Sequence, residues 1–167
     1  MVSIRELLSK LSSAGVEYTV VGGVAARLHG SALTTDDLDV CCPMDEKNME
    51  RLIQAIGDLD PKFRFHPRLP PLPTSAQQLS KFHNLNLITT HGKLDVLGEI
   101  TGIGNYDDVA KHVVVLEVDG KPIRVLDLDG LIVAKKAAGR DKDKLGIMYL
   151  EAVKRRKARE LGLFDNK

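Results

Sequence analysis

The sequence predicts an α/β fold in which a small mixed β-sheet is flanked by helices. Segments with apolar residues at helical spacing are interspersed with short β-branched runs, and Gly-containing turns mark two hairpins. The chain has 167 residues, of which 43% are hydrophobic and 28% charged, as is usual for a globular protein with a buried core. We therefore expect a single domain over residues 1–167.

Composition and charge exclude several classes of protein. The 24 Lys and Arg residues balance 23 Asp and Glu residues, which argues against a chain that is basic throughout and coats nucleic acid nonspecifically. No apolar run approaches the ~20 residues of a membrane helix, and the N-terminal stretch is unlike a signal peptide. Cys41 and Cys42 are adjacent and lack metal-site spacing. We expect a cytoplasmic protein with reduced thiols and no membrane partner.

The first half of the chain alternates helices and strands. Ile4, Leu7, Leu8 and Leu11 lie on one face of a first helix, which Gly15 ends. In chain order, the next predicted elements are a strand over 16–21, a tight turn at Gly22-Gly23, a short helix over 24–28, a strand over 37–42 closed by Pro43, and a helix over 44–57.

The second half begins with a proline-rich insertion near residues 58–82. Five prolines fall between Pro61 and Pro73, which favours extended or looping chain, either a lid or an inert surface loop. The elements predicted after it are a short helix over 75–82, a hairpin over 84–97 around His91-Gly92, a hairpin over 113–125 around Asp119-Gly120, and a helical C-terminal segment over 127–161 interrupted at Gly139.

Asp37 and Asp39 form the first candidate chemical feature. Because they are two residues apart on a strand, their side chains leave the same face, with Cα atoms about 7 Å apart. Like charges so placed repel unless solvent or a cation compensates them. Carboxylates on a strand suit Mg²⁺ or Mn²⁺, completed by substrate phosphates. Gly22 and Gly23 can cradle those phosphates through backbone N–H groups, and the helix that follows would present its positive end.

The Asp-x-Asp pattern is weak evidence by itself, because it occurs four times in the chain. Asp58/Asp60 flank a helix end, and Asp127/Asp129 fall where a helix N-cap is expected. Asp95 strengthens the case for the first pair, because it is the lone acid in an apolar strand, Leu94-Asp95-Val96. If that strand neighbours the one with Asp37 and Asp39, three acids converge, as a two-metal phosphoryl-type transfer requires. Otherwise these acids lie on a solvated strand face.

Together, these features resemble the polymerase-β-like nucleotidyltransferase superfamily. The resemblance rests on Gly22-Gly23, on Asp37-Leu38-Asp39 after thirteen intervening residues, and on the isolated Asp95, and it spans most of the chain. It implies that Asp37, Asp39 and Asp95 bind divalent metal, that Asp95 also acts as base, and that the glycines hold a nucleoside triphosphate. Relatives often carry an arginine or a Ser/Thr motif before the acids; here Thr34 and Thr35 stand without the arginine, and Thr35 is the expected nucleotide contact.

A later motif is similar to that of small bacterial nucleotidyltransferases of the abortive-infection and toxin–antitoxin types. It runs from Leu131 to Asp143 and contains Lys135, Arg140 and Asp143. The resemblance implies that Lys135 and Arg140 face the nucleotide or acceptor and that Asp143 orients one of them. Since Gly139 separates the two cations, they share a face only if the helix break brings them back together.

The function that this pattern predicts is metal-dependent transfer of a nucleoside monophosphate from an NTP to an acceptor. The acceptor is RNA, protein or a small molecule, and the resemblance adds a role as the toxin of a toxin–antitoxin pair, with a cognate antitoxin as partner. The alternative is a catalytically silent nucleotide-binding or interaction module of the same fold. The basic run at 154–159 is either a solvated helix face or a nucleic-acid contact.

Other nucleotide-binding and metal-binding classes do not fit. Gly22-Gly23 lacks the spacing of the dinucleotide-binding fingerprint, and the sequence has no GxxxxGK[ST] phosphate-binding loop. The five histidines show no pair at metal-ligand spacing, which argues against zinc.

Overall fold

A computed structural model describes residues 2–162. The helices are α1 (Val2–Ser13), α2 (Gly22–Leu28), α3 (Glu46–Ile56), α4 (Ala76–Leu79), α5 (Tyr106–Ala110), α6 (Leu128–Ala138) and α7 (Asp141–Glu160), with a 3₁₀ turn at Gly57–Leu59. The strands are β1 (Thr19–Val21), β2 (Asp37–Cys41), β3 (Lys62–Phe63), β4 (Asn84–Thr89), β5 (Gly92–Leu97), β6 (Glu99–Ile100), β7 (Gly104–Asn105), β8 (Val113–Val118) and β9 (Lys121–Leu126).

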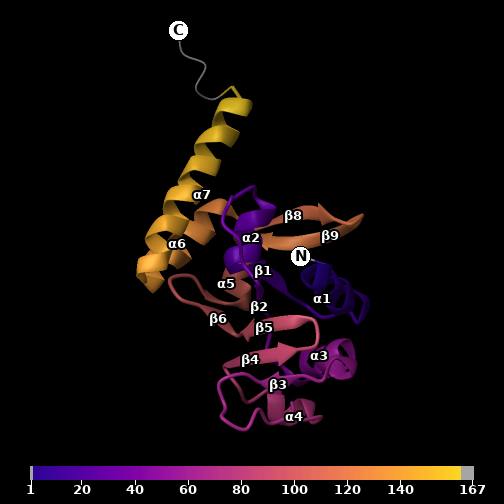
Figure 1. Ribbon diagram of the computed structural model, residues 1–167. Helices are drawn as coiled ribbons and strands as arrows, with labels where there is room; N and C mark the ends of the chain where they lie inside the picture. The colour runs from indigo at the N-terminus through magenta and orange to yellow at the C-terminus, as the bar shows by residue number, and fades with distance from the viewer. Residues whose placement is uncertain (1, 163–167) are drawn as a thin grey trace.

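Seven strands form one mixed sheet in the order β3-β4-β5-β2-β1-β9-β8, and β6 and β7 pair separately (Figure 1). The hairpins β4–β5 and β8–β9 are antiparallel, and so is the β1–β2 pair. The central β2–β5 pair is parallel, as is β1–β9. The predicted α/β class with a small mixed sheet and flanking helices is therefore confirmed.

The two faces of the central sheet differ in polarity. Side chains alternate along a strand, so one face of β2, β4 and β5 carries residues that are all fully buried: Leu38, Val40, Leu85, Leu87, Leu94 and Val96. On the opposite face, the same strands carry Asp37, Asp39, Asn86, Lys93 and Asp95. Burial of the first face fixes the register, because a slip of one residue would turn the acids into the core.

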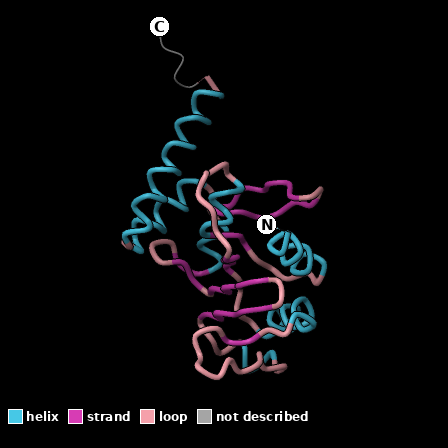
Figure 2. Tube along the Cα trace, in the orientation of Figure 1, coloured by secondary structure: helices cyan, strands magenta, loops and turns pink. Residues whose placement is uncertain are grey.

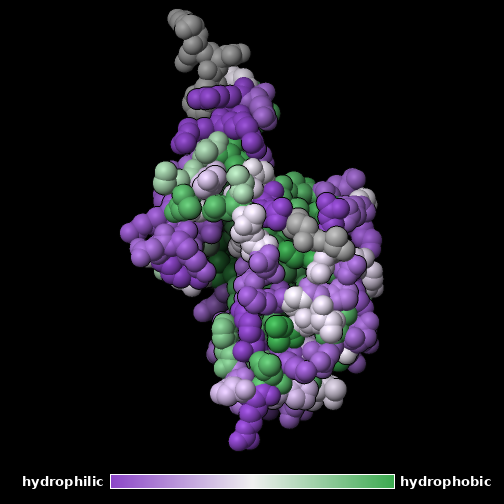
Figure 3. Space-filling model, viewed as in Figure 1, coloured by the Kyte–Doolittle hydropathy of each residue, from purple (hydrophilic) through white to green (hydrophobic). Residues whose placement is uncertain are grey.

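Helices α6 and α7 form a pair that stands beside the sheet. They pack against each other, and α6 also contacts α2. In Figure 2, α7 projects well beyond the rest of the chain, and Figure 3 shows hydrophilic side chains over its outer end. Within residues 2–162, no helix has the length and apolar character needed to cross a membrane.

Most predicted elements are present, and the differences have local causes. Gly22 and Gly23 begin α2 rather than forming a separate turn before it. The proline-rich stretch contains β3, which pairs with β4 at the sheet edge, where a strand tolerates neighbouring prolines. The sequence analysis did not anticipate α5, β6 or β7, which have five residues or fewer. Asp119 and Gly120 both have positive φ, of 51° and 77°, as an Asp-Gly hairpin turn requires.

The N-cap of α6 provides a test of this fold. The Asp127 carboxylate accepts a hydrogen bond from the Gly130 N–H at 2.6 Å, as the sequence predicts. Replacing Asp127 with Ala should lower the free energy of unfolding by about 1 kcal/mol, measured by urea denaturation. Asp129→Ala, which removes an exposed ion pair with Lys154, is the matched control and should cost less than about 0.5 kcal/mol. Equal losses in the two variants would contradict the capping role.

Candidate active site

A cavity of about 950 Å³ lies over the polar face of the sheet. The sheet residues of β2, β4 and β5 form one side of it, and residues of α6, α7 and the start of α2 form the others. The structure brings all the predicted site residues to its lining: Gly22, Gly23, Thr35, Asp37, Asp39, Asp95, Lys135, Arg140 and Asp143. The structure thus brings these residues together, and their chemical roles stay predictions.

The parallel pairing of β2 with β5 sets the acids side by side. Asp39 is in register with Asp95, and Asp37 is in register with Lys93. The β4–β5 hairpin adds Asn86 opposite Asp95. A row of polar side chains therefore crosses three neighbouring strands on one face of the sheet.

The two glycines leave room for the acids and for a ligand. Gly22 has a φ of +64°, and a Cβ atom at this position would overlap the Asp39 carboxylate. A Cβ atom at Gly23 would lie 2.8 Å from the Cβ of Thr35. Any side chain at either position would have to displace a predicted site residue, so the structure needs glycine at both.

Arg64 is a site residue that the sequence analysis missed. Its Nη2 donates to both carboxylate oxygens of Asp95, at 2.9 and 3.0 Å, and its Nη1 lies 3.8 Å from Asp37. The Nδ2 of Asn86 also donates to Asp95, at 3.0 Å. Lys93 Nζ lies 3.6 Å from the other oxygen of Asp37. Asp95 is therefore held by two donors, while the charge of Asp37 is offset by two nearby cations.

Asp39 is the acid that these cations compensate least. Burial raises its pKa to about 7, and the charge of Asp95, a hydrogen bond with Asp95 and the charge of Asp37 add to the effect, against a smaller opposing effect of Arg64. Without bound ions, Arg64 and Lys93 compensate the charges of Asp37 and Asp95 better than that of Asp39.

On the far side of the cavity, the Asp143 carboxylate contacts both Lys135 and Arg140. Arg140 donates to it through Nε at 2.8 Å and Nη2 at 3.2 Å, and Lys135 Nζ lies 3.7 Å from its Oδ1. The helix break at Gly139, with a φ of +65°, returns Arg140 to the side of Lys135. Burial opposes ionisation of Asp143, but the hydrogen bonds from Arg140 outweigh it and hold the pKa of Asp143 below its ordinary value.

The carboxylates of Asp37, Asp39 and Asp95 are suitable ligands for a hard divalent cation, but they are not already arranged around a single ion position. Carboxylate oxygens are the ligands that Mg²⁺ prefers, and Mg²⁺ is often held by one or two of them together with substrate phosphates. Within residues 2–162, no group of three or more Asp, Glu, His or Cys side chains is arranged to hold one ion. Arg64 is the reason in part, because its guanidinium bridges Asp37 and Asp95.

The sequence carries a local signal for one of the two additional site residues, Asn86, and none for the other, Arg64. Asn86 lies on a strand of the predicted hairpin, but its pairing differs from the prediction. A two-residue turn at His91-Gly92 would set Ile88 opposite Asp95, whereas the structure pairs Thr89 with Gly92 and so brings Asn86 there. Arg64 has no comparable signal, because it lies in the proline-rich stretch, which lacks periodicity. Its position depends on the pairing of β3 with β4, which the sequence analysis did not expect.

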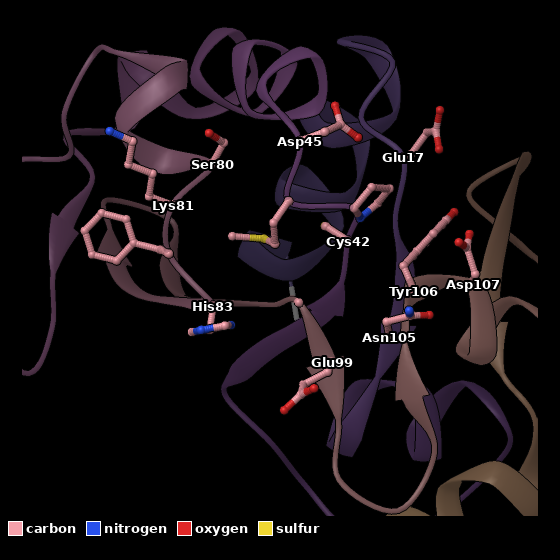
Figure 4. Close-up of a pocket in the computed structure, with 14 residues that line it drawn as sticks. Glu17, Cys42, Asp45, Ser80, Lys81, His83, Glu99, Asn105, Tyr106 and Asp107 are labelled. Atoms are coloured by element: carbon pink, nitrogen blue, oxygen red, sulfur yellow. The ribbon is translucent and has the colours of Figure 1, made fainter.

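A second cavity, of about 600 Å³, lies near the carboxyl ends of β2 and β5 (Figure 4). The side chains drawn there include Glu17, Asp45, Lys81, His83 and Tyr106. Glu99 lines both cavities, so they adjoin at that residue. No predicted site residue lines the second cavity.

Comparisons with known proteins add little to this geometry. No family model matches the chain, and no curated relative matches it. The chain is similar to a crystal structure described as a "putative nucleotidyltransferase" from Thermotoga maritima, with 17% sequence identity and a TM-score of 0.49 over 98% of this chain and 91% of that chain. A likeness at this level does not bear on what the chain does.

The raised pKa of Asp39 predicts that the acid destabilises the ion-free protein at neutral pH. An acid whose pKa rises on folding contributes stability below its unfolded value of 3.8 and loses that contribution as the pH rises to about 7. Asp39→Asn, which mimics the neutral acid, should therefore raise the melting temperature at pH 8 and leave it nearly unchanged at pH 4. Asp36→Asn, at the exposed neighbour, is the control. A lower melting temperature for Asp39→Asn at pH 8 would contradict this account.

The Asp143 cluster predicts the opposite pH dependence. Asp143→Asn removes a carboxylate that accepts charged hydrogen bonds, so it should cost roughly 2 kcal/mol of unfolding free energy at pH 7. Because folding lowers the pKa of Asp143, the loss should begin to shrink as the pH falls below the ordinary value of 3.8 and should disappear only once the pH has passed below the lowered pKa of the folded protein. Asp141→Asn, at a fully exposed side chain, serves as control in the same urea titrations. A loss of equal size at pH 3 and pH 7 would argue against the cluster.

Proposed function

We propose that the chain is a metal-dependent nucleotidyltransferase that transfers a nucleoside monophosphate from an NTP to an acceptor and releases pyrophosphate. The observation that carries the proposal is the placement of Asp37, Asp39 and Asp95 on one sheet face, at one side of a cavity whose other side presents Lys135 and Arg140. Acids on one side and cations on the other suit a ligand whose phosphates bind both metal and protein.

The cavity has the size and polarity that a nucleoside triphosphate requires. Ligand cavities of about 300–1,000 Å³ are typical for molecules of this size, and this one holds about 950 Å³. Lys135, Arg140 and Lys142 line the same cavity and can contact phosphate oxygens. Gly22 and Gly23 carry no side chains, so the backbone there can approach the phosphates closely. Thr35 lies beside Gly23, where it can contact the nucleotide.

Within this proposal, Asp37 and Asp39 hold Mg²⁺ or Mn²⁺, and Asp95 completes one site. A bound divalent ion would supply charge stabilisation for the transferring phosphate and lower the pKa of the acceptor hydroxyl. Asp95 accepts the proton of that hydroxyl. Arg64 and Asn86 donate hydrogen bonds to Asp95, so Asp95 must lose at least one of them to accept that proton.

The acceptor class and the toxin role rest on the sequence resemblance. The basic run at 154–159 offers limited support for an RNA acceptor, because three of its members already have partners. Lys154 pairs with Asp129, Arg156 pairs with Glu160, and Lys157 lies 3.3 Å from the Nδ1 of His29. These contacts favour a structural role for much of the run, which leaves RNA, protein and small molecules as candidate acceptors and a cognate antitoxin as a candidate partner.

A catalytically silent nucleotide-binding module is the second candidate function. The specific observation in its favour is Arg64, which engages the third acid and bridges it to Asp37. A module of this kind would bind NTP through the same cavity without transferring it. Transfer of label and nucleotide binding must therefore be measured separately.

Transfer of label tests the proposed function directly. The purified protein, incubated with each α-³²P-labelled NTP, Mg²⁺ and a cell extract, should label one of the RNA, protein or small-molecule fractions. Asp37→Ala, Asp39→Asn and Asp95→Asn should each reduce labelling by at least about 100-fold, because each removes a carboxylate from the proposed metal site. Chelation of divalent ions with EDTA should have the same effect.

Asp58→Asn is the matched control, because Asp58 belongs to another Asp-x-Asp pattern and pairs with Lys10 on the surface. It should retain full labelling. Retention of activity by Asp37→Ala would refute the assigned site. Nucleotide binding without labelling of any fraction would favour the silent module.

A further inference from the structure

We propose that Arg64 is a resident counter-cation of the acidic cluster, which a divalent ion must displace from Asp95 and Asp37 in order to bind. The inference rests on the proposed function and deepens it, since it names a further residue that controls metal loading of the same site. It concerns the protein before any nucleotide binds.

The Arg64 guanidinium lies between the carboxylates of Asp95 and Asp37. Arg64 places Nη2 at 2.9 and 3.0 Å from the two oxygens of Asp95 and Nη1 at 3.8 Å from Asp37. These are two of the three carboxylates that would hold a divalent ion in the proposed site. The side chain is only 15% exposed, so the contact is made inside the cavity and not on an open surface where solvent would screen it.

The acidic cluster contains more negative than positive charge. Three carboxylates face two cations, Arg64 and Lys93, and Lys93 is 47% exposed and contacts only Asp37. Arg64 is therefore the main compensating charge for Asp95. A divalent ion held by the same oxygens would bring a like charge against the guanidinium, so the two should not occupy the carboxylates together.

The remaining contacts of Arg64 suggest how its side chain can leave. Its backbone is fixed, because its N–H donates to Asn86 O at 2.9 Å at the edge of the sheet. Its Nε and Nη1 are buried, and no hydrogen-bond partner for them is found within the described residues. The guanidinium stacks on Phe65 at 4.6 Å, and Phe65 is 76% exposed. Rotation of the Arg64 side chain past the exposed Phe65 ring, toward solvent, would free the acids without moving the strand.

The consequence is a measurable competition between the arginine and the metal. Removing the guanidinium should increase the affinity for a divalent ion, in contrast to a residue that helps to hold one. A neutral side chain at position 64 leaves Asp37 and Asp95 without their shared partner, and an incoming ion then meets no opposing charge at these oxygens.

Titration with Mn²⁺ alone, in the absence of nucleotide, tests this inference. Free Mn²⁺ is measured by electron paramagnetic resonance for the full-length wild-type protein, Arg64→Gln and Arg64→Met. Both variants should bind Mn²⁺ at least tenfold more tightly than the wild type. Arg64→Met retains an unbranched stem against Phe65, so it provides a second variant if Arg64→Gln folds poorly, as judged by circular dichroism. Arg68→Gln removes the same charge from an exposed position of the same segment and should bind like the wild type.

Unchanged or weaker Mn²⁺ binding by both position-64 variants would overturn the inference. So would equal tightening in Arg68→Gln, because the effect would then reflect net charge alone. The proposed function fails separately: tighter Mn²⁺ binding by Arg64→Gln, together with no transfer of label from any NTP, would keep the role of Arg64 and reject nucleotidyl transfer. Absence of Mn²⁺ binding in all the proteins would also overturn the inference, while transfer of label would still decide the proposed function.

Discussion

The parallel pairing of β2 with β5 is the constraint on which the site depends. It places Asp39 directly beside Asp95, with Asp37 two residues away on the same face. The apolar side chains on the other face of these two strands, Leu38, Val40, Leu94 and Val96, are completely buried. The strands therefore cannot shift in register to separate the acids. Core packing therefore holds like charges together at a free-energy cost, which is a frequent property of sites that bind ions or carry out catalysis.

The rest of the cavity is organised around that concentration of negative charge. Arg64 reaches it from the turn that follows β3, and Lys93 reaches it from β5, but Asp39 is left with a raised pKa. Across the cavity, the buried Asp143 carboxylate forms ion pairs with Lys135 and Arg140 and so holds both side chains on that side. The two halves thus have opposite sign, and a polyanion carrying its own metal ions would complement both.

Sequence reasoning predicted the parts of this arrangement that depend on local pattern. The Asp119-Gly120 turn, the helix ended by Gly139 and the Asp127 cap each have a short-range signal, and the structure has all three. The sequence predicts the convergence of Asp95 with Asp39 only if their strands are neighbours, since residues 56 positions apart in sequence carry no signal of parallel pairing. Arg64 could not be predicted, because its position depends on β3 joining the sheet within a stretch whose prolines favour loops.

Anomalous diffraction from crystals grown with Mn²⁺ and a non-hydrolysable NTP analogue would test the central claim most directly. The account predicts a manganese peak in contact with the Asp37 and Asp39 carboxylates, with the triphosphate extending toward Lys135 and Arg140 and the Arg64 guanidinium withdrawn from Asp95. Manganese or nucleotide bound elsewhere, with Arg64 still between Asp37 and Asp95, would contradict it.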